Sequence, residues 1–200
     1  MKKNLLFLLM TFLLTIGSIS LKAQDDNVVT IGDVENNTTT PSYYYPVRSK
    51  AYYNISQHYY LKDEINKTNG FITELAFHVY SSNDSYDYSR NIEIYLLSSD
   101  ETYFNAGETV AVSSAKKVFS GNIKFEGSNN WVSVPLTTPF EYNGNNILVC
   151  INDITGSQTD NTDGNLTFSV LETTQARSIY QSNINTATFG TTPYTPTVQN

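Results

Sequence analysis

Tyrosine is the residue type whose number and spacing in this sequence best suggest binding chemistry. The chain contains 15 tyrosines, and most of them lie between Tyr43 and Tyr103. A tyrosine ring stacks on the flat face of a sugar, and its hydroxyl forms a hydrogen bond at the rim. Tyrosine is also a good strand residue, so half-buried rings in a sheet are the alternative interpretation. The sequence predicts an aromatic ligand-binding platform whose candidate residues are Tyr43, Tyr45, Tyr52 and Tyr59.

Acidic residues in polar segments form a second candidate site, for calcium. Calcium binds roughly six to eight oxygen ligands, which carboxylates and loop carbonyls supply. The segment Asp160–Asn165 lacks the ligand spacing of an EF-hand loop, so that motif is not met. The alternative is that these carboxylates are solvated turn residues. The candidate ligands of a structural calcium are Asp33, Glu35, Asp153, Asp160 and Asp163.

Catalytic motifs are weak in this sequence. The two histidines are His58 and His78, and no G-x-S-x-G motif accompanies them. The single cysteine, Cys150, lies in the segment Ile147–Ile151, which is apolar on both alternating faces and predicts a buried thiol. A pair of acidic residues for glycoside hydrolysis remains open, because any two of the 19 acidic side chains could converge. We expect a protein that is not an enzyme.

The first 23 residues have the pattern of a signal peptide for export. Lys2 and Lys3 precede the apolar segment Leu5–Ile16, and small residues follow before Gln24. A membrane-spanning helix needs about 20 apolar residues, and this segment is shorter. The sequence therefore predicts a signal peptide at residues 1–23, a mature domain at residues 24–200 without a transmembrane segment, and a location outside the cell or on its outer surface.

The charge of the chain argues against nucleic acid as a partner. The whole sequence has a net charge of −7, and removal of residues 1–23, which contain three lysines and no acidic residue, leaves a net charge of −10. Such a charge repels phosphate backbones. One cysteine cannot form a disulfide within the chain, so an exported domain must be stabilised by its core alone.

Hydrophobic residues alternate with polar ones along almost the whole mature chain. Alternation with one polar face is typical of half-buried antiparallel strands, and the connecting segments are rich in Asn and Gly. We expect a single all-β domain, an antiparallel and jelly-roll-like β-sandwich of about 8–10 strands, with only a short helical turn at Ala111–Lys116. The expected strands are Asn27–Ile31, Tyr43–Val47, Tyr52–Leu61, Phe71–Tyr80, Asn91–Leu97, Lys117–Phe125, Trp131–Leu136, Ile147–Ile151, Leu166–Val170 and Ala176–Gln181.

The apolar faces of these strands predict which residues meet. In the strand Phe71–Tyr80, the inward set is Phe71, Leu75, Phe77 and Val79. Across the domain we expect one core that contains Phe77, Ile94, Phe119, Val134, Val149 and Phe168.

The order of short motifs also resembles a known module. The motifs are Val28–Asp33, Tyr43–Val47, Gly70–Phe77, Ile92–Leu96 and Pro139–Gly144. In this order they resemble a β-sandwich module common in secreted, surface-directed proteins of Bacteroidetes, similar to the adhesin and haemagglutinin regions that accompany gingipain-type proteases. The resemblance covers roughly Val28 to Tyr180. It implies a binding or adhesion module of the cell surface or extracellular space, but its motifs say little about the ligand. The tyrosine content favours a carbohydrate-binding role, with a glycan or a host or cell-surface protein as the partner.

Two departures from that module bear on domain organisation. Such modules usually close with a further strand, whereas this sequence ends at Pro196–Asn200, so we expect the last strand to be missing. Relatives often end in a separate sorting domain, which is not present here. We therefore expect either a small independent protein that is a monomer, or the first part of a longer chain. Two other functions stay open: an ancillary, non-catalytic domain of a longer secreted protease or glycoside hydrolase, and a structural spacer.

Overall fold

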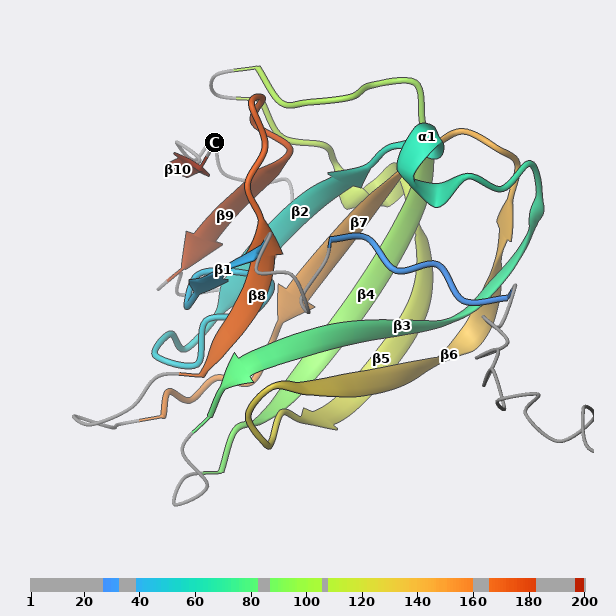
Figure 1. Cartoon of the computed structure of the whole chain (residues 1–200). Helices are drawn as coiled ribbons and strands as arrows, with labels where there is room; N and C mark the ends of the chain where they lie inside the picture. Colours follow the sequence, from blue (N-terminus) through green and yellow to red (C-terminus); the bar gives the residue numbers. More distant parts are fainter. Residues whose placement is uncertain are drawn as a thin grey trace, which may run out of the picture.

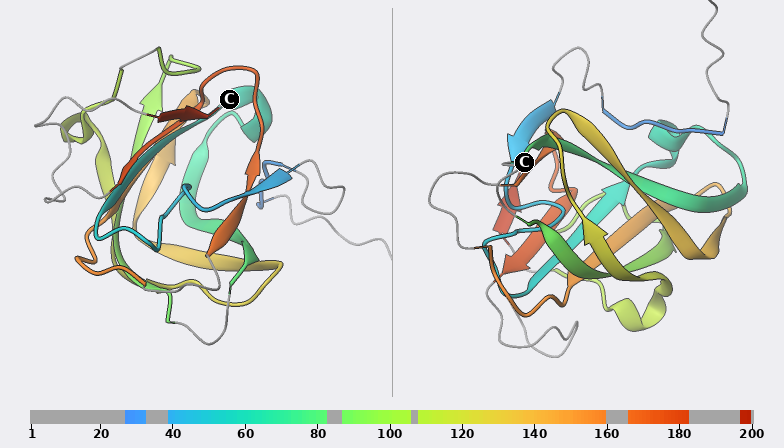
Figure 2. Two further views of the ribbon diagram at one scale, coloured as in Figure 1. Left: turned by 90° about the vertical axis from the view of Figure 1, so that its left-hand side faces the viewer. Right: turned by 90° about the horizontal axis from the view of Figure 1, so that it is seen from below.

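The fold consists of two antiparallel sheets that face each other, as Figures 1 and 2 show. The computed structural model describes residues 27–32, 39–82, 87–105, 108–159, 166–182 and 197–199, and the expected signal peptide lies outside these residues. The four-stranded sheet has the order β1 (Thr39–Ser42), β8 (Thr167–Leu171), β3 (Gly70–Ser81) and β6 (Asn130–Tyr142). The six-stranded sheet has the order β10 (Thr197–Gln199), β9 (Ser178–Ser182), β2 (Asn54–Tyr60), β7 (Asn146–Asp153), β4 (Ser89–Ser99) and β5 (Lys116–Lys124).

Strand pairing follows the nested scheme of a jelly roll. Strand β4 pairs with β5, β3 with β6, β2 with β7 and β1 with β8, as in one long hairpin that has been rolled up. This scheme is that of two linked Greek keys. It confirms the expected all-β, jelly-roll-like sandwich. Strands β9 and β10 extend the six-stranded sheet beyond β2.

Helical structure is short in the part of the chain that the structure describes. Helix α1 (Lys62–Ile65) follows β2, and the 3₁₀ turn η1 (Val112–Ser114) lies where the sequence predicts a helical turn. Among the described residues, no helix is long and apolar enough to cross a membrane.

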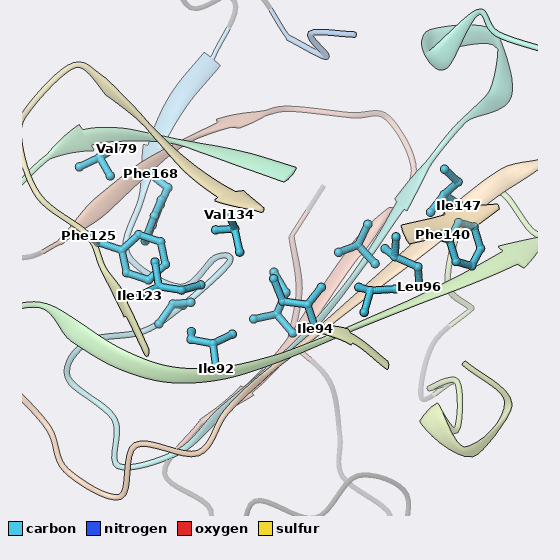
Figure 3. Packing of buried hydrophobic residues seen from close by; sticks show 14 of the residues in the cluster. Val79, Ile92, Ile94, Leu96, Ile123, Phe125, Val134, Phe140, Ile147 and Phe168 are labelled. Atoms are coloured by element: carbon cyan, nitrogen blue, oxygen red, sulfur yellow. The ribbon is translucent and has the colours of Figure 1, made fainter. Parts of the chain in front are cut away.

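The main core lies between the two sheets and contains all six residues that the alternation predicts. Ile94, Val134, Val149 and Phe168 are buried, and Phe77 and Phe119 pack against them while partly exposed. Figure 3 shows this packing, with side chains from both sheets pointing toward one another. Ring edges add directional contacts, since Phe125 lies edge-on to Phe168 with ring centroids 5.1 Å apart.

A second apolar cluster covers the outer face of the six-stranded sheet. The long connection between β4 and β5 folds over this face, so that Phe104 packs with Leu148 and Cys150 of β7. The side-chain amide of Gln57 fixes the connection, because it donates to the Val110 carbonyl (2.6 Å) and accepts from the Val110 N–H (3.0 Å). Strand β7 is therefore buried on both faces. The prediction of a buried thiol at Cys150 is confirmed.

Some of the expected strand positions are wrong. Phe71 points outward and is 69 % exposed, because a β-bulge between Ile72 and Glu74 changes which residues face the core. Ile72 packs on the core in its place. Residues 27–31 form no strand, and β1 lies at Thr39–Ser42, before the expected Tyr43–Val47. Strand β10, which pairs with β9, was not among the expected strands.

A buried ion pair holds one end of the sandwich together. The Arg90 guanidinium in β4 bonds the Asp153 carboxylate in β7 through Nε (2.7 Å) and Nη2 (2.6 Å). Its remaining N–H groups donate to the carbonyls of Ser49, Ala51 and Ser157. The second Asp153 oxygen accepts from the N–H and hydroxyl of Thr155. Both charges are fully buried, and all their hydrogen-bonding groups are used.

The first prediction concerns this ion pair. Asp153→Asn leaves the Arg90 charge buried without a counter-charge, so we expect the free energy of unfolding to fall by about 3–5 kcal/mol. Urea denaturation at pH 7 measures it. The control is Lys124→Ala, which breaks the exposed Lys124–Glu126 pair and is expected to cost less than about 1 kcal/mol. Equal losses for the two variants would show that Arg90 and Asp153 do not hold the fold together.

Candidate functional site

Four tyrosines form a continuous row of rings at one edge of the sandwich. The row, called the tyrosine cluster here, consists of Tyr43, Tyr44, Tyr180 and Tyr45. Ring centroids are 4.1 Å apart for Tyr43–Tyr44, 4.7 Å for Tyr44–Tyr180 and 5.2 Å for Tyr180–Tyr45. The row runs from Tyr43, which is 41 % exposed, to Tyr45, which is buried. It thus presents aromatic surface outward on a base that is anchored in the protein.

The connection between β1 and β2 positions this cluster. Because β9 lies beyond β2 in the six-stranded sheet, the connection packs on the face of β2 and β9 that carries Ser56 and Tyr180. The Ser56 hydroxyl donates to the Pro46 carbonyl (2.7 Å), which fixes the middle of the connection to β2. At its start, the Ser42 hydroxyl accepts from the Tyr44 N–H (3.2 Å).

Arg48 adds a cation to the cluster. Its guanidinium carbon lies 5.1 Å from the centroid of the Tyr44 ring, within the range of a cation–π contact. Its Nη1 donates to the Ser182 hydroxyl of β9 (2.7 Å). Tyr44 is therefore held between Arg48, Tyr43 and Tyr180. The phenol oxygens of Tyr43 and Tyr44 lie 2.8 Å apart, and this hydrogen bond raises the pKa of Tyr43, which stays protonated at neutral pH.

His58 packs against Tyr45, the buried end of the tyrosine cluster. The hydrogen-bond partners and burial of His58 determine which ring nitrogen carries the proton. The Tyr45 ring packs edge-on to the imidazole, with centroids 5.4 Å apart. Ser56 uses its only proton for the Pro46 carbonyl, so its oxygen accepts from His58 Nε2–H at 2.8 Å. Nδ1 then accepts from the Ser178 hydroxyl at 2.9 Å. Burial lowers the pKa of His58 to about 3, which keeps the imidazole neutral.

The four tyrosines predicted from the sequence as ligand-binding residues differ in exposure. Tyr43 and Tyr52 are exposed, Tyr52 to 50 %, whereas Tyr45 and Tyr59 are buried, so these two do not offer ring faces to a ligand. Tyr45 turns inward onto His58, and Tyr59 packs on Phe104 beneath the β4–β5 connection. Tyr52 has no ring contact with another aromatic side chain in the described residues. Of the four predicted rings, only those of Tyr43 and Tyr52 are exposed, and their role in binding stays a prediction.

Sequence reasoning reaches Tyr44 but misses Tyr180 and Arg48. Tyr44 lies in the tyrosine-rich segment from which the platform is predicted, but residues 43–47 form no strand, so alternation does not say which of them points outward. Tyr180 and Arg48 join the cluster through tertiary contacts with distant residues, for which the sequence has no signal. Only the density of tyrosines near Tyr43 pointed to this location.

The candidate calcium ligands do not come together in the described residues. Asp33, Glu35, Asp160 and Asp163 lie outside the residues that the structure describes. Asp153, expected in a polar loop, is instead the last residue of β7, and Arg90 and Thr155 occupy both of its oxygens. Within the described part of the chain, no group of three His, Cys, Asp or Glu side chains is placed to hold a metal ion.

Cys150 and Glu93 are of residue types that can act in catalysis, but their environments in the fold give them structural roles. Burial raises the pKa of the Cys150 thiol to about 12, so little of the nucleophilic thiolate forms at neutral pH. Burial would also raise the pKa of Glu93, but hydrogen bonds from Lys117 (2.6 Å) and Tyr95 (2.9 Å) outweigh it and lower the pKa. Glu93 therefore stays ionised, as the centre of an ion-paired network on the face of β4.

No family model, curated protein or solved structure matches this chain. The resemblance to surface modules of Bacteroidetes therefore remains an expectation from the sequence motifs. The function is inferred from the tyrosine cluster and the groups around it.

The second prediction concerns His58 and pH. As the pH falls below the ordinary value of 6.5, the unfolded chain binds a proton at this histidine, whereas the folded chain does so only near pH 3. Stability is therefore lost as the pH falls, by up to about 1.4 kcal/mol per pH unit from this group. His58→Gln retains a donor and an acceptor but does not titrate.

Urea denaturation at pH 7 and pH 5 measures the effect. Between these two values the native sequence should lose about 2 kcal/mol more than His58→Gln. The same dependence on pH in both proteins would mean that His58 is not neutral in the folded state.

Proposed function

We propose that this protein is an exported, non-catalytic binding module that holds a neutral glycan against the tyrosine cluster. The observation that supports this most is the exposed ring of Tyr43, stacked on Tyr44 and anchored to β9 through Tyr180. A ring held in this way loses little conformational freedom on binding, which favours affinity. The signal-peptide pattern of residues 1–23 supports export to the cell surface or the extracellular space.

The chemistry of the cluster suits a sugar. Tyr43 offers an exposed apolar ring for the C–H face of a pyranose, Tyr44 supports that ring, and the two hydroxyls reach polar groups at the rim of the sugar. Arg48 adds guanidinium donors next to the rings. The net charge of −10 expected for the mature chain disfavours acidic polysaccharides, so a neutral glycan is the better ligand.

We expect the affinity of one site to be modest. A single aromatic stack contributes on the order of 1 kcal/mol. Two rings and a few hydrogen bonds then give a dissociation constant nearer to millimolar than to nanomolar. Firm attachment to a glycan surface needs several copies on one cell, because linked weak sites gain through their effective concentration.

A binding role also agrees with the surroundings of the chemically reactive side chains. Cys150 is buried as a neutral thiol, and His58 is buried as a neutral imidazole. Both lie beneath packed residues rather than at the exposed end of the tyrosine cluster.

The third prediction tests this proposal. A glycan array on residues 24–200 identifies ligands, and isothermal titration calorimetry then measures their affinity. The double variant Tyr43→Ala/Tyr44→Ala removes the exposed ring and the ring that supports it, and should weaken binding at least tenfold. The control is Tyr52→Ala, which removes an exposed ring that has no aromatic contact in the described residues.

Thermal denaturation shows that each variant is folded before binding is measured. Neutral glycans should bind both with and without calcium. Binding restricted to acidic glycans in the presence of calcium, or equal weakening by Tyr52→Ala and the double variant, would contradict the proposal.

A further inference from the structure

The outer face of the four-stranded sheet carries a second group of exposed aromatic residues. Trp131 of β6 is 43 % exposed, and Tyr80 of β3 is 50 % exposed. Trp131 lies directly opposite His78 of β3 in the antiparallel pairing, and Val132 and Val79, which follow them, face the core. The indole therefore projects from the side of the sheet that faces away from the core. Figure 1 shows β3 and β6 side by side in this layer.

His78 fixes the orientation of the indole. The two rings pack edge-on, with centroids 5.0 Å apart and an interplanar angle of 69°. His78 is itself held from β8, because its Nδ1 is hydrogen-bonded to the Ser169 hydroxyl at 2.8 Å. Three neighbouring strands thus contribute to one rigid arrangement. His78 is 7 % exposed, and its second ring nitrogen, Nε2, has no hydrogen-bond partner among the described residues.

The described residues that pair beside these two rings are uncharged. The neighbours in the strand pairing are Ala76 opposite Ser133 and Pro41 opposite Ser169. Partial burial lowers the pKa of His78, so the imidazole is neutral at neutral pH. The next outward-facing position on β3 is a carboxylate, Glu74, opposite Pro135. An uncharged row of described residues with one carboxylate at its end suits a neutral partner that offers hydroxyl groups, and disfavours an anion.

We infer that Trp131 and His78 form a second binding site, which takes the ring of a neutral sugar. The apolar face of the sugar stacks on the indole, and one of its hydroxyls forms a hydrogen bond with His78 Nε2. Ser133 and Ser169 provide further hydroxyls on the same strip. The inference shares its ligand class with the proposed function but rests on different residues, so either site can exist without the other.

The two sites use different residues and different sheets. Trp131 belongs to β6, which packs beside the edge strand β5, and the Thr137 hydroxyl donates to the Val118 carbonyl across the two sheets. The tyrosine cluster lies on β9, beyond β2 in the other direction along the six-stranded sheet. One chain with both sites would contact glycan at two points, which adds avidity.

Trp131 is the single tryptophan of the sequence, so intrinsic fluorescence reports on this site alone. Residues 24–200 are titrated with two neutral probes, a β-1,4-glucan hexamer and an α-1,4-glucan hexamer, and with the neutral glycan that gives the strongest array signal. We expect a saturable change in tryptophan emission with at least one of these, and at least twofold protection from quenching by acrylamide at saturation. The same change should persist in Tyr43→Ala/Tyr44→Ala, which retains the Trp131 site.

Variants separate this site from the tyrosine cluster. His78→Phe retains an aromatic ring beside the indole but removes Nε2, and should weaken the fluorescence-detected affinity about fivefold. Trp131→Ala should abolish the calorimetric binding that remains in the double tyrosine variant. Tyr52→Ala is the matched control and should change neither.

The outcomes distinguish the two proposals. No saturable change of emission with any of the three glycans overturns the Trp131 site, even where calorimetry detects binding at the tyrosine cluster. A saturable change that is equal in the native sequence and the double tyrosine variant, with no further binding by calorimetry, supports the Trp131 site and overturns the tyrosine cluster as a glycan site. An emission change that His78→Phe leaves unaltered overturns the assigned role of His78.

Discussion

The buried ion pair between Arg90 and Asp153 is the interaction on which the arrangement of this protein most depends. A guanidinium and a carboxylate removed from water are tolerated only where every hydrogen-bonding group has a partner. Here the partners are backbone carbonyls of Ser49, Ala51 and Ser157. The requirement to satisfy Arg90 therefore fixes the β1–β2 connection at its far end, and the other end of that connection carries Tyr43 and Tyr44. An electrostatic constraint inside the sandwich thus positions the aromatic surface at its edge.

The topology explains why aromatic residues stay exposed at two places. Strands β9 and β10 extend only the six-stranded sheet, so a connection rather than a strand packs on β9, and its tyrosines reach the surface. On the four-stranded sheet, the side away from the core presents Trp131 and His78. By contrast, the outer side of the six-stranded sheet is covered by the β4–β5 connection through Phe104 and Val110. Other exposed rings, such as Phe71 and Tyr52, have no aromatic partner in the described residues.

Alternation in the sequence predicted the sheets and the core because one face of most strands is buried. It identified Ile94, Val134 and Phe168 correctly, but it placed Phe71 inward because a β-bulge has no signature in period-two spacing. Arg90, a cation at the start of an amphipathic strand, has the sequence pattern of a solvated residue, and only the folded chain shows its carbonyl partners. The sequence predicted only part of the tyrosine cluster. The density of tyrosines indicated the position of Tyr43, whereas the ring contact with Tyr180 depends on strand β9, which is distant in the sequence.

The central claim is that this sandwich binds neutral sugars through rigid aromatic surfaces at its edges. Amide chemical shifts in ¹H–¹⁵N spectra of residues 24–200, recorded during titration with a neutral oligosaccharide, test that claim over the whole chain at once. The account predicts shift changes confined to two groups, residues 43–48 with 178–182 and residues 76–80 with 131–133 and 169. Changes centred elsewhere, or an unchanged spectrum at saturating sugar, would contradict it.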